Sequence, residues 1–410
     1  MGPWLHADVD SGWIETMDFV IVGNPWHFGA RNPTSKHQIA WELARQGHRV
    51  LWVNAGGLRT PRVGSGLDRR RVLERLAWAA RGLDRVDSGT WVISPLVVPI
   101  PSSRAARALN TRIYLWTARR AVRKLNFSRP ALVNFFHMIP VTMRDWKGVT
   151  VYYCVDRWDA FGRYDRSLME KLHRQSCEEA DIVIVSSGAL LQQVRACRDD
   201  ARLILHGVDY RHFRQALERE GEHGDRPVDL PPGRLVGFFG LLDERLDQEL
   251  VLNLARSLER PEGSKAQVVL IGPSDVDVSR LAAQPNIEML GPKPYSEIPG
   301  YLRHFDVCVI PYVLTEQTEA VNPIKLREML AGGCPVVATA LPEVARYAGE
   351  HGRAVAVAED EGAFIAGVHR FLDAPPSRAE RLAISHAMKS ETWEAKVREL
   401  LALIEQADSA

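Results

Sequence analysis

Lys325 and Glu328 are the two charged side chains whose spacing best suits a phosphorylated ligand. They lie in segment 322–339, which opens with Asn322 and passes two glycines into an apolar run. Asn322 is a favoured N-cap, and the start of a helix offers free N–H groups to a phosphate. Glu328 would lie roughly 7–8 Å along the helix axis from Pro323, within reach of a ribose. The segment predicts a nucleotide diphosphate site; the alternative is a well-capped surface helix.

A second candidate phosphate loop, residues 237–247, follows another apolar run. Gly240 in this loop would let a diphosphate approach the backbone. Arg245 and Lys325 are the expected stabilisers of the negative charge that develops on a departing diphosphate. The alternative for Arg245 is a surface salt bridge with Glu244 or Asp247.

Further polar candidates follow expected strands in the first half of the chain. Gly23 with Asn24 starts the loop expected to lie nearest the diphosphate, and His137 and Asp156 follow two later strands. A histidine could orient a sugar hydroxyl or relay a proton, although a buried histidine bonded to backbone is the alternative. Asp156 could contact an acceptor or cap the next helix. Lys36 could reach an anionic acceptor, or be solvated at a helix start.

The elements that position these residues alternate between apolar runs and helical periodicity, which predicts an α/β fold with parallel sheets covered on both faces. No G-x-G-x-x-G motif follows the first strand, so a dinucleotide site is not expected. The charged, Gly- and Pro-rich segment 218–233 is the expected linker. The expected strands are residues 18–23, 47–53, 90–93, 131–135, 149–154, 181–185, 202–205, 235–239, 267–271, 287–290, 306–310 and 335–339, and the expected helices include 34–46, 247–257, 295–304 and 377–406.

Length and composition describe a two-domain globular protein. The chain has 410 residues, 46% hydrophobic and 25% charged, and no apolar run reaches the ~18 residues that span a membrane. The polar N-terminus does not read as a signal peptide, so a cytoplasmic location is expected. Five cysteines without C-x-x-C spacing predict reduced thiols, and neither a metal nor another cofactor is expected.

Basic residues are concentrated between residues 59 and 124. This region carries fifteen Lys and Arg against four acidic residues, although the net charge of the whole chain is +1. Leucines and tryptophans are interleaved with the arginines. The pattern predicts a peripheral contact with an anionic membrane face or an anionic acceptor; the alternative is a pair of solvated helices. Nucleic acid is not expected as a partner.

Three motifs resemble those of retaining group 1 glycosyltransferases of family four, which have the GT-B architecture of two Rossmann-like domains. Glu328 precedes Ala-Gly-Gly-Cys-Pro-Val-Val, and residues 206–213 and 153–158 match two further anchors. The resemblance is closest to bacterial surface polysaccharide enzymes, including teichuronic acid glycosyltransferases. It implies that Glu328 holds the ribose and that the base lies near Tyr295.

The match is imperfect at the residue expected to meet the sugar. A glutamate is expected at position 320, where this chain has Ala320, and Glu319 is the neighbouring candidate. The resemblance further implies an acceptor domain (17–217), a nucleotide-sugar domain (234–385) facing it across a cleft, and a C-terminal crossing helix (386–410).

Together these features predict transfer of a sugar from a nucleotide-diphosphate donor to a glycan, lipid-linked or small-molecule acceptor. Stereochemical retention is implied by the resemblance alone. Two alternatives remain open: a nucleotide-sugar epimerase on the same fold, and a non-catalytic nucleotide-sugar-binding scaffold.

Overall fold

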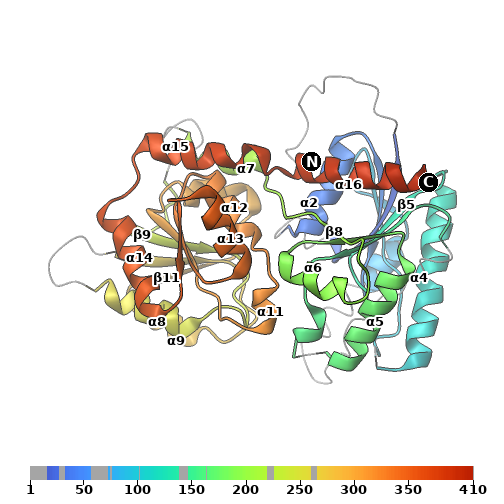
Figure 1. The fold of residues 1–410 in the computed structure, drawn as a ribbon, viewed down its shortest axis with the longest axis horizontal. Helices are drawn as coiled ribbons and strands as arrows, with labels where there is room; N and C mark the ends of the chain where they lie inside the picture. The colour runs from blue at the N-terminus through green and yellow to red at the C-terminus, as the bar shows by residue number, and fades with distance from the viewer. Residues whose placement is uncertain are drawn as a thin grey trace.

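The computed structural model consists of two α/β domains joined by a linker (Figure 1). The polar N-terminus and the arginines between residues 59 and 75 lie outside the described residues, and so does part of the predicted linker. None of the described helices is long and apolar enough to cross a membrane. The described residues are 16–26, 33–56, 73, 76–100, 102–137, 146–162, 164–218, 226–259 and 266–409.

The first domain contains an eight-stranded sheet in the order β3-β4-β2-β1-β5-β6-β7-β8. All neighbouring strands are parallel except β3 and β4. β1 and β6 are buried along their whole length, as expected of parallel strands covered on both faces. The strands are β1 (Asp18–Gly23), β2 (Arg49–Asn54), β3 (Asp84–Arg85), β4 (Thr90–Ile93), β5 (Ala131–Asn134), β6 (Thr150–Cys154), β7 (Ile182–Val185) and β8 (Arg202–Leu203).

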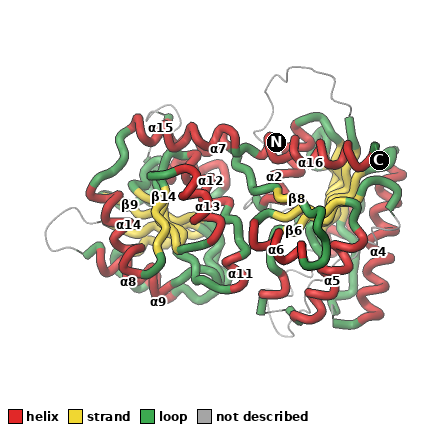
Figure 2. Tube along the Cα trace, viewed as in Figure 1, coloured by secondary structure: helices red, strands yellow, loops and turns green. Residues whose placement is uncertain are grey.

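The second domain contains a six-stranded parallel sheet in the order β11-β10-β9-β12-β13-β14. In both domains the strands form the centre and the helices lie outside them (Figure 2). The strands are β9 (Arg234–Phe239), β10 (Ala266–Ile271), β11 (Ile287–Gly291), β12 (Val307–Ile310), β13 (Val336–Thr339) and β14 (Val355–Ala358).

Helices of both domains follow the strands in sequence. In the first domain and the linker they are α2 (Ser35–Arg45), α4 (Arg104–Lys124), η2 (Trp158–Ala160), α5 (Arg166–Glu179), α6 (Gly188–Arg195), α7 (Tyr210–Phe213) and η3 (Arg214–Leu217). Those that follow are α8 (Gln248–Ser257), α9 (Ser279–Ala282), η4 (Tyr295–Glu297), α10 (Ile298–Leu302), α11 (Glu316–Glu319), α12 (Ile324–Ala331), α13 (Pro342–His351), α14 (Glu361–Asp373), α15 (Arg378–His386), η5 (Ala387–Ser390) and α16 (Trp393–Asp408).

The last helix, α16, crosses back to the first domain and lies along it (Figure 1). It packs on α2 and β7. Its buried residues, which include Trp393 and Leu400, belong to the hydrophobic core of the first domain. Arg45 of α2 reaches Glu394 at its start. The tail therefore ties the two domains together.

Three predicted elements differ from the structure. The strand predicted over 202–205 is only β8, because Ile204 turns into the core after Leu203. The helix predicted over 295–304 is a 3-10 turn followed by a short α-helix, with Pro299 near its start. The predicted tail helix 377–406 is broken by the 3-10 turn η5, after which Thr392 caps α16.

Candidate functional site

Lys325 lies directly over the loop that follows β9. Gly240 in this loop has φ +140°, and a Cβ there would lie 1.8 Å from Lys325 Cε. A Cβ on Gly272, at the end of the neighbouring strand, would lie 1.7 Å from the Gly240 oxygen. Only glycines allow these approaches. The two predicted phosphate elements are thus brought together in one place.

Asn322 does not cap the helix that carries Lys325, so this prediction is wrong. Pro323 occupies the N-cap position of α12 and provides no side-chain cap. The Asn322 side chain is buried instead between the domains: it donates to the Ser186 carbonyl (2.8 Å) and accepts from Arg327 (2.8 Å). Asn322 therefore contributes to joining the domains, and the first N–H groups of α12 have no side-chain cap.

Glu328 lies one turn further along α12 and is partly exposed. No described residue donates a hydrogen bond to its carboxylate, which leaves the oxygens available to a ligand. Burial raises the pKa of Glu328 from its ordinary value of 4.5 to about 7; Lys325 opposes this rise and Asp209 adds to it. Asp209 caps α7 through the His212 N–H. Sequence reasoning did not include Asp209 among the site residues.

Tyr295 lies beside this carboxylate, but its ring is already engaged. One face stacks on His212 with 4.4 Å between ring centroids, and its hydroxyl accepts a hydrogen bond from Gln38 of the first domain (3.2 Å). Burial raises the pKa of Tyr295 well above its usual range, with a further contribution from Glu328. The residue therefore belongs to the interdomain junction, and stacking on a base stays a prediction.

Arg245 forms an ion pair inside its own loop, but with Asp243 and not with Glu244 or Asp247, the partners that the alternative named. Its partner is Asp243, which takes Nε at 2.9 Å and Nη2 at 2.6 Å. The guanidinium also lies 5.5 Å from the Tyr312 ring centroid and interacts electrostatically with Asp156 of the other domain. Arg245 thus faces the junction between the domains. To stabilise a leaving diphosphate, its guanidinium would have to bind the diphosphate while it is also paired with Asp243.

Asp156 lies opposite Arg245 and close to Lys36 of α2. The Lys36 ammonium is 3.9 Å from the Asp156 carboxylate and is almost fully buried. Burial lowers the pKa of Lys36, and Asp156 opposes the change. Asp156 does not cap the next helix, since Arg157 occupies that position. A solvated Lys36 at the helix start was one of the two alternatives from the sequence. The structure instead buries this side chain at the edge of the first sheet.

His137 follows β5 but is 1% exposed. Its Nδ1 lies 3.2 Å from the Tyr152 hydroxyl, and its buried Nε2 has no hydrogen-bond partner. Burial, assisted by His173, lowers the pKa of His137 to about 3. The imidazole is therefore neutral near pH 7, and any catalytic use of it would be as a base or as a neutral donor.

Gly23 and Asn24 end β1 against an aromatic side chain. A Cβ on Gly23 would lie 2.1 Å from the Trp52 ring, whose Nε1 donates to the Asn24 carbonyl (2.9 Å). The glycine is thus required by packing on Trp52, and the position of this loop nearest the diphosphate stays a prediction. The buried Asn24 Oδ1 has no hydrogen-bond partner.

Position 320 lies in the junction, and Glu319 points elsewhere. Ala320 is 2% exposed, and its carbonyl accepts from Ser187 of the first domain (2.7 Å). Glu319 is exposed on α11. Its neighbour Glu316 pairs with Arg157 and Arg166 of the first domain. The surroundings of Ala320 are therefore closed by the first domain, and a glutamate there would be buried.

Comparison with known proteins finds a family model that matches the second domain. Residues 233–374 match the family model of group 1 glycosyl transferases. The chain is 28% identical over 224 residues to the "Putative teichuronic acid biosynthesis glycosyltransferase TuaH" of Bacillus subtilis (strain 168), a match that covers 50% of this chain and 53% of that protein. The chain thus spans about half the length of this curated relative.

Solved structures agree with the whole fold. Sucrose-phosphate synthase from Thermosynechococcus elongatus superposes with a TM-score of 0.66 at 16% identity, covering 95% of this chain and 98% of that one. A UDP-forming α,α-trehalose-phosphate synthase from Burkholderia xenovorans gives 0.65 at 13% identity, covering 96% and 100%. The chain therefore has the GT-B fold, and its residues 233–374 match the model of the group 1 glycosyl transferases.

Proposed function

We propose that this protein transfers a sugar from a nucleotide-diphosphate sugar to an acceptor held by the first domain. The observation that carries the proposal is the placement of Lys325 over the Gly240 loop, with Glu328 one turn further on. A cation against a glycine loop suits a diphosphate, and a carboxylate to which no described residue donates a hydrogen bond suits ribose hydroxyls. These residues lie within the part of the chain that matches the group 1 family.

The acceptor side of the proposed reaction is formed by charged residues of the first domain. Lys36 and Asp156 lie at the sheet edge that faces the second domain, and Asp156 interacts electrostatically with Arg245. A buried ammonium beside a carboxylate can orient a hydroxyl or hold an anionic group of the acceptor. We infer that a glycan, lipid-linked or small-molecule acceptor binds here, with Arg245 and Lys325 stabilising the leaving diphosphate.

Lys325→Met tests the proposal directly. Removing the charge should lower the rate of transfer, or of donor hydrolysis, by about 10²–10³-fold, the usual cost of losing one stabilising group on a developing anion. The measurement is release of UDP from a panel of UDP-sugars, with other sugar nucleotides in parallel. Lys389→Met, a surface change on η5, is the matched control. Equal rates in the two variants would contradict the assignment of Lys325.

The same assay separates the alternative functions. An epimerase would interconvert sugar nucleotides without any acceptor. A scaffold would bind UDP normally but release none from a donor. The comparisons favour neither alternative. Retention, which the resemblance alone implies, is tested by the anomeric signals of the product in NMR.

The outer face of α4 supports a peripheral membrane contact, which we include in the proposal. No acidic residue occurs in this helix. Leu109 and Trp116 are 47% and 60% exposed, and Arg112, Arg120 and Arg123 are exposed on the same face by helical spacing. Exposed apolar side chains among arginines match an anionic lipid surface. Such a contact would bring the acceptor domain to lipid-linked glycans.

Sedimentation with vesicles tests this surface. Arg120→Gln with Arg123→Gln should weaken binding to phosphatidylglycerol vesicles by roughly thirtyfold, because each arginine near an anionic surface contributes about 1 kcal/mol. Phosphatidylcholine vesicles should bind neither form. Arg398→Gln, a change of an arginine with 73% side-chain exposure on α16, is the control. If the double variant sediments as the unchanged protein does, α4 is not a membrane surface.

A further inference from the structure

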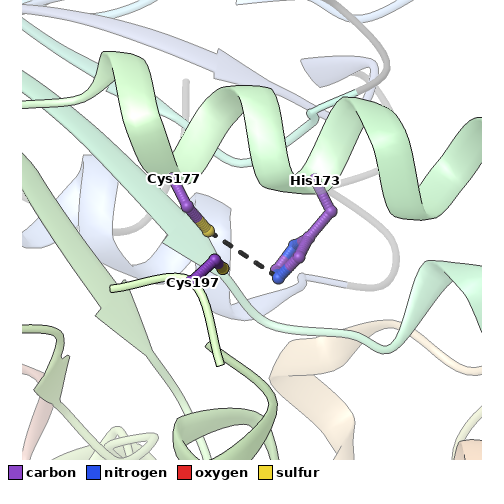
Figure 3. Close-up of side chains that lie close together, drawn as sticks. All are labelled: His173, Cys177 and Cys197. Atoms are coloured by element: carbon purple, nitrogen blue, oxygen red, sulfur yellow. Dashed lines mark hydrogen bonds between the residues drawn. The ribbon is translucent and has the colours of Figure 1, made fainter. Parts of the chain in front are cut away.

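Three soft metal-ligand side chains converge in the first domain, away from Lys325 and Glu328. His173 and Cys177 lie four residues apart on one face of α5, and Cys197 follows the end of α6. Figure 3 shows the imidazole and the Cys177 thiol directed toward each other, with Cys197 facing them from a neighbouring segment. One donor atom from each residue lies within 4.8 Å of the other two. The sugar transfer proposed above does not involve these three residues.

The distance between His173 and Cys177 matches that of a tetrahedral zinc site, and Cys197 lies within 4.8 Å of both. Zinc–sulfur and zinc–nitrogen bonds of about 2.3 and 2.0–2.1 Å place the ligand atoms of such a site roughly 3.5–3.8 Å apart. His173 Nε2 is 3.7 Å from Cys177 Sγ. Cys197 Sγ contacts the Val194 carbonyl at 3.2 Å and would exchange this contact for the metal. A side-chain movement of about 1 Å within the group completes the geometry.

The surroundings of the imidazole fix the nitrogen that a metal needs. His173 Nδ1 lies 2.9 Å from the Tyr152 hydroxyl, which leaves Nε2 directed at the sulfurs. Metal-binding histidines usually have such a partner on the other ring nitrogen. Burial lowers the pKa of His173 to about 4, so the ring is neutral near pH 7 and its lone pair is available.

Each of the two cysteines would bind a metal as a thiolate and would release its proton on binding. Burial raises the pKa of Cys177, and Cys197 raises it further. The Arg198 guanidinium acts in the opposite direction and favours a thiolate. Its Nη1 atom donates to the carbonyl of Cys177 at 2.9 Å, which keeps the positive charge next to the group.

We propose that His173, Cys177 and Cys197 form a zinc-class metal site with one coordination position left open to water or to another ligand. One imidazole and two thiolates are the donor set that zinc prefers over magnesium or calcium. The Tyr152 hydroxyl also contacts His137, so the metal would fix the hydrogen-bonded chain that leads toward the acceptor side. The site thus supports the structure of the first domain.

Cobalt titration under reducing conditions tests the proposal, because thiolate–Co²⁺ bonds absorb in the near ultraviolet. The full-length protein should bind one Co²⁺ with a charge-transfer band, and Zn²⁺ should displace it. Protein purified without chelator should retain up to one zinc per chain by mass spectrometry. Cys197→Ser should weaken Co²⁺ binding at least tenfold and reduce the band. Cys334→Ala, a change of a buried cysteine in the other domain, should leave both unchanged.

A second variant separates loss of a ligand from misfolding. Tyr152→Phe keeps all three ligands and should weaken binding of Co²⁺ by about 10–100-fold, the usual effect of removing the partner of a metal-bound histidine, while the band keeps its shape. No band at one equivalent of Co²⁺ in the unchanged protein would overturn the proposal. A Cys177–Cys197 disulfide found by mass spectrometry in protein kept reduced throughout purification would overturn it too.

Discussion

At the residue scale, Glu328 is a carboxylate of the candidate site whose pKa is raised well above its ordinary value. No described residue donates a hydrogen bond to its carboxylate. Burial raises the pKa of this carboxylate to about 7, and the nearby Asp209 adds to the rise. The pKa of Glu328 in the folded protein lies above its ordinary value of 4.5. Its contribution to the free energy of unfolding is therefore fully present below about pH 4.5 and is lost as the pH rises through about 7. The site thus keeps a costly carboxylate, which fits a binding role better than a structural one.

Glu328 should make nucleotide affinity depend on pH. The ionised carboxylate accepts ribose hydrogen bonds, and its fraction rises about tenfold between pH 6 and pH 8 when the pKa is about 7. UDP affinity measured by calorimetry should therefore rise more steeply over this interval in the unchanged protein than in Glu328→Gln, which retains only the titration of the ligand. If UDP affinity had the same pH dependence in both proteins, Glu328 would not be the residue that binds the ribose. At pH 8, Glu328→Ala should lose about 2 kcal/mol of binding free energy.

At the element scale, the Gly240 loop and α12 act as one unit. The Gly240 N–H donates to the Ile271 carbonyl (2.8 Å), and Leu242 is bonded to the Pro273 carbonyl (2.9 Å), so the loop is fastened to the neighbouring strand. Lys325 then packs on the bare glycine. Neither element alone would hold the Lys325 ammonium at the strand edge, so its position depends on the glycine at residue 240.

Gly240→Ala should remove activity without removing a charged group. The new Cβ would occupy the place of Lys325 Cε, and the positive φ adds strain of about 1–3 kcal/mol. We expect donor turnover to fall as far as in Lys325→Met, together with a lower melting temperature. Gly300→Ala in α10 is the control, since a Cβ there meets no atom within 4 Å. Normal turnover in Gly240→Ala would show that Lys325 does not need its present position.

At the scale of the whole molecule, a buried polar group joins the domains near the candidate site. Asn322 links the Ser186 carbonyl of the first domain to Arg327 of α12, and Arg327 continues to Glu391 before α16. Gly188 N–H donates to Glu343 across the same junction (2.7 Å). The relative position of the domains is therefore set by directional contacts as well as by the crossing helix.

Asn322→Ala should weaken this connection. It leaves the buried Ser186 carbonyl and one nitrogen of Arg327 without their partner, at a cost of about 1–3 kcal/mol. Calorimetry should show a lower melting temperature and a broader transition as the domains begin to unfold separately. Asn253→Ala removes an amide at the surface, where it bonds Glu361, and should change little. Equal melting curves for the two variants would contradict a joining role for Asn322.

The sequence by itself determined the two parallel-sheet domains, because apolar runs and helical periodicity report burial locally, whereas the crossing tail was implied only by the resemblance to group 1 glycosyltransferases. It also predicted Lys325, Glu328 and Gly240 as site residues, since helix starts and glycine loops are local signals. Tertiary structure decided what depends on neighbours from distant segments. Asn322 donates to the Ser186 carbonyl instead of capping its own helix. The Trp52 ring packs on Gly23, and Arg245 forms its ion pair with Asp243. The grouping of His173 with Cys197 is of the same kind, because spacing along the chain says nothing of it.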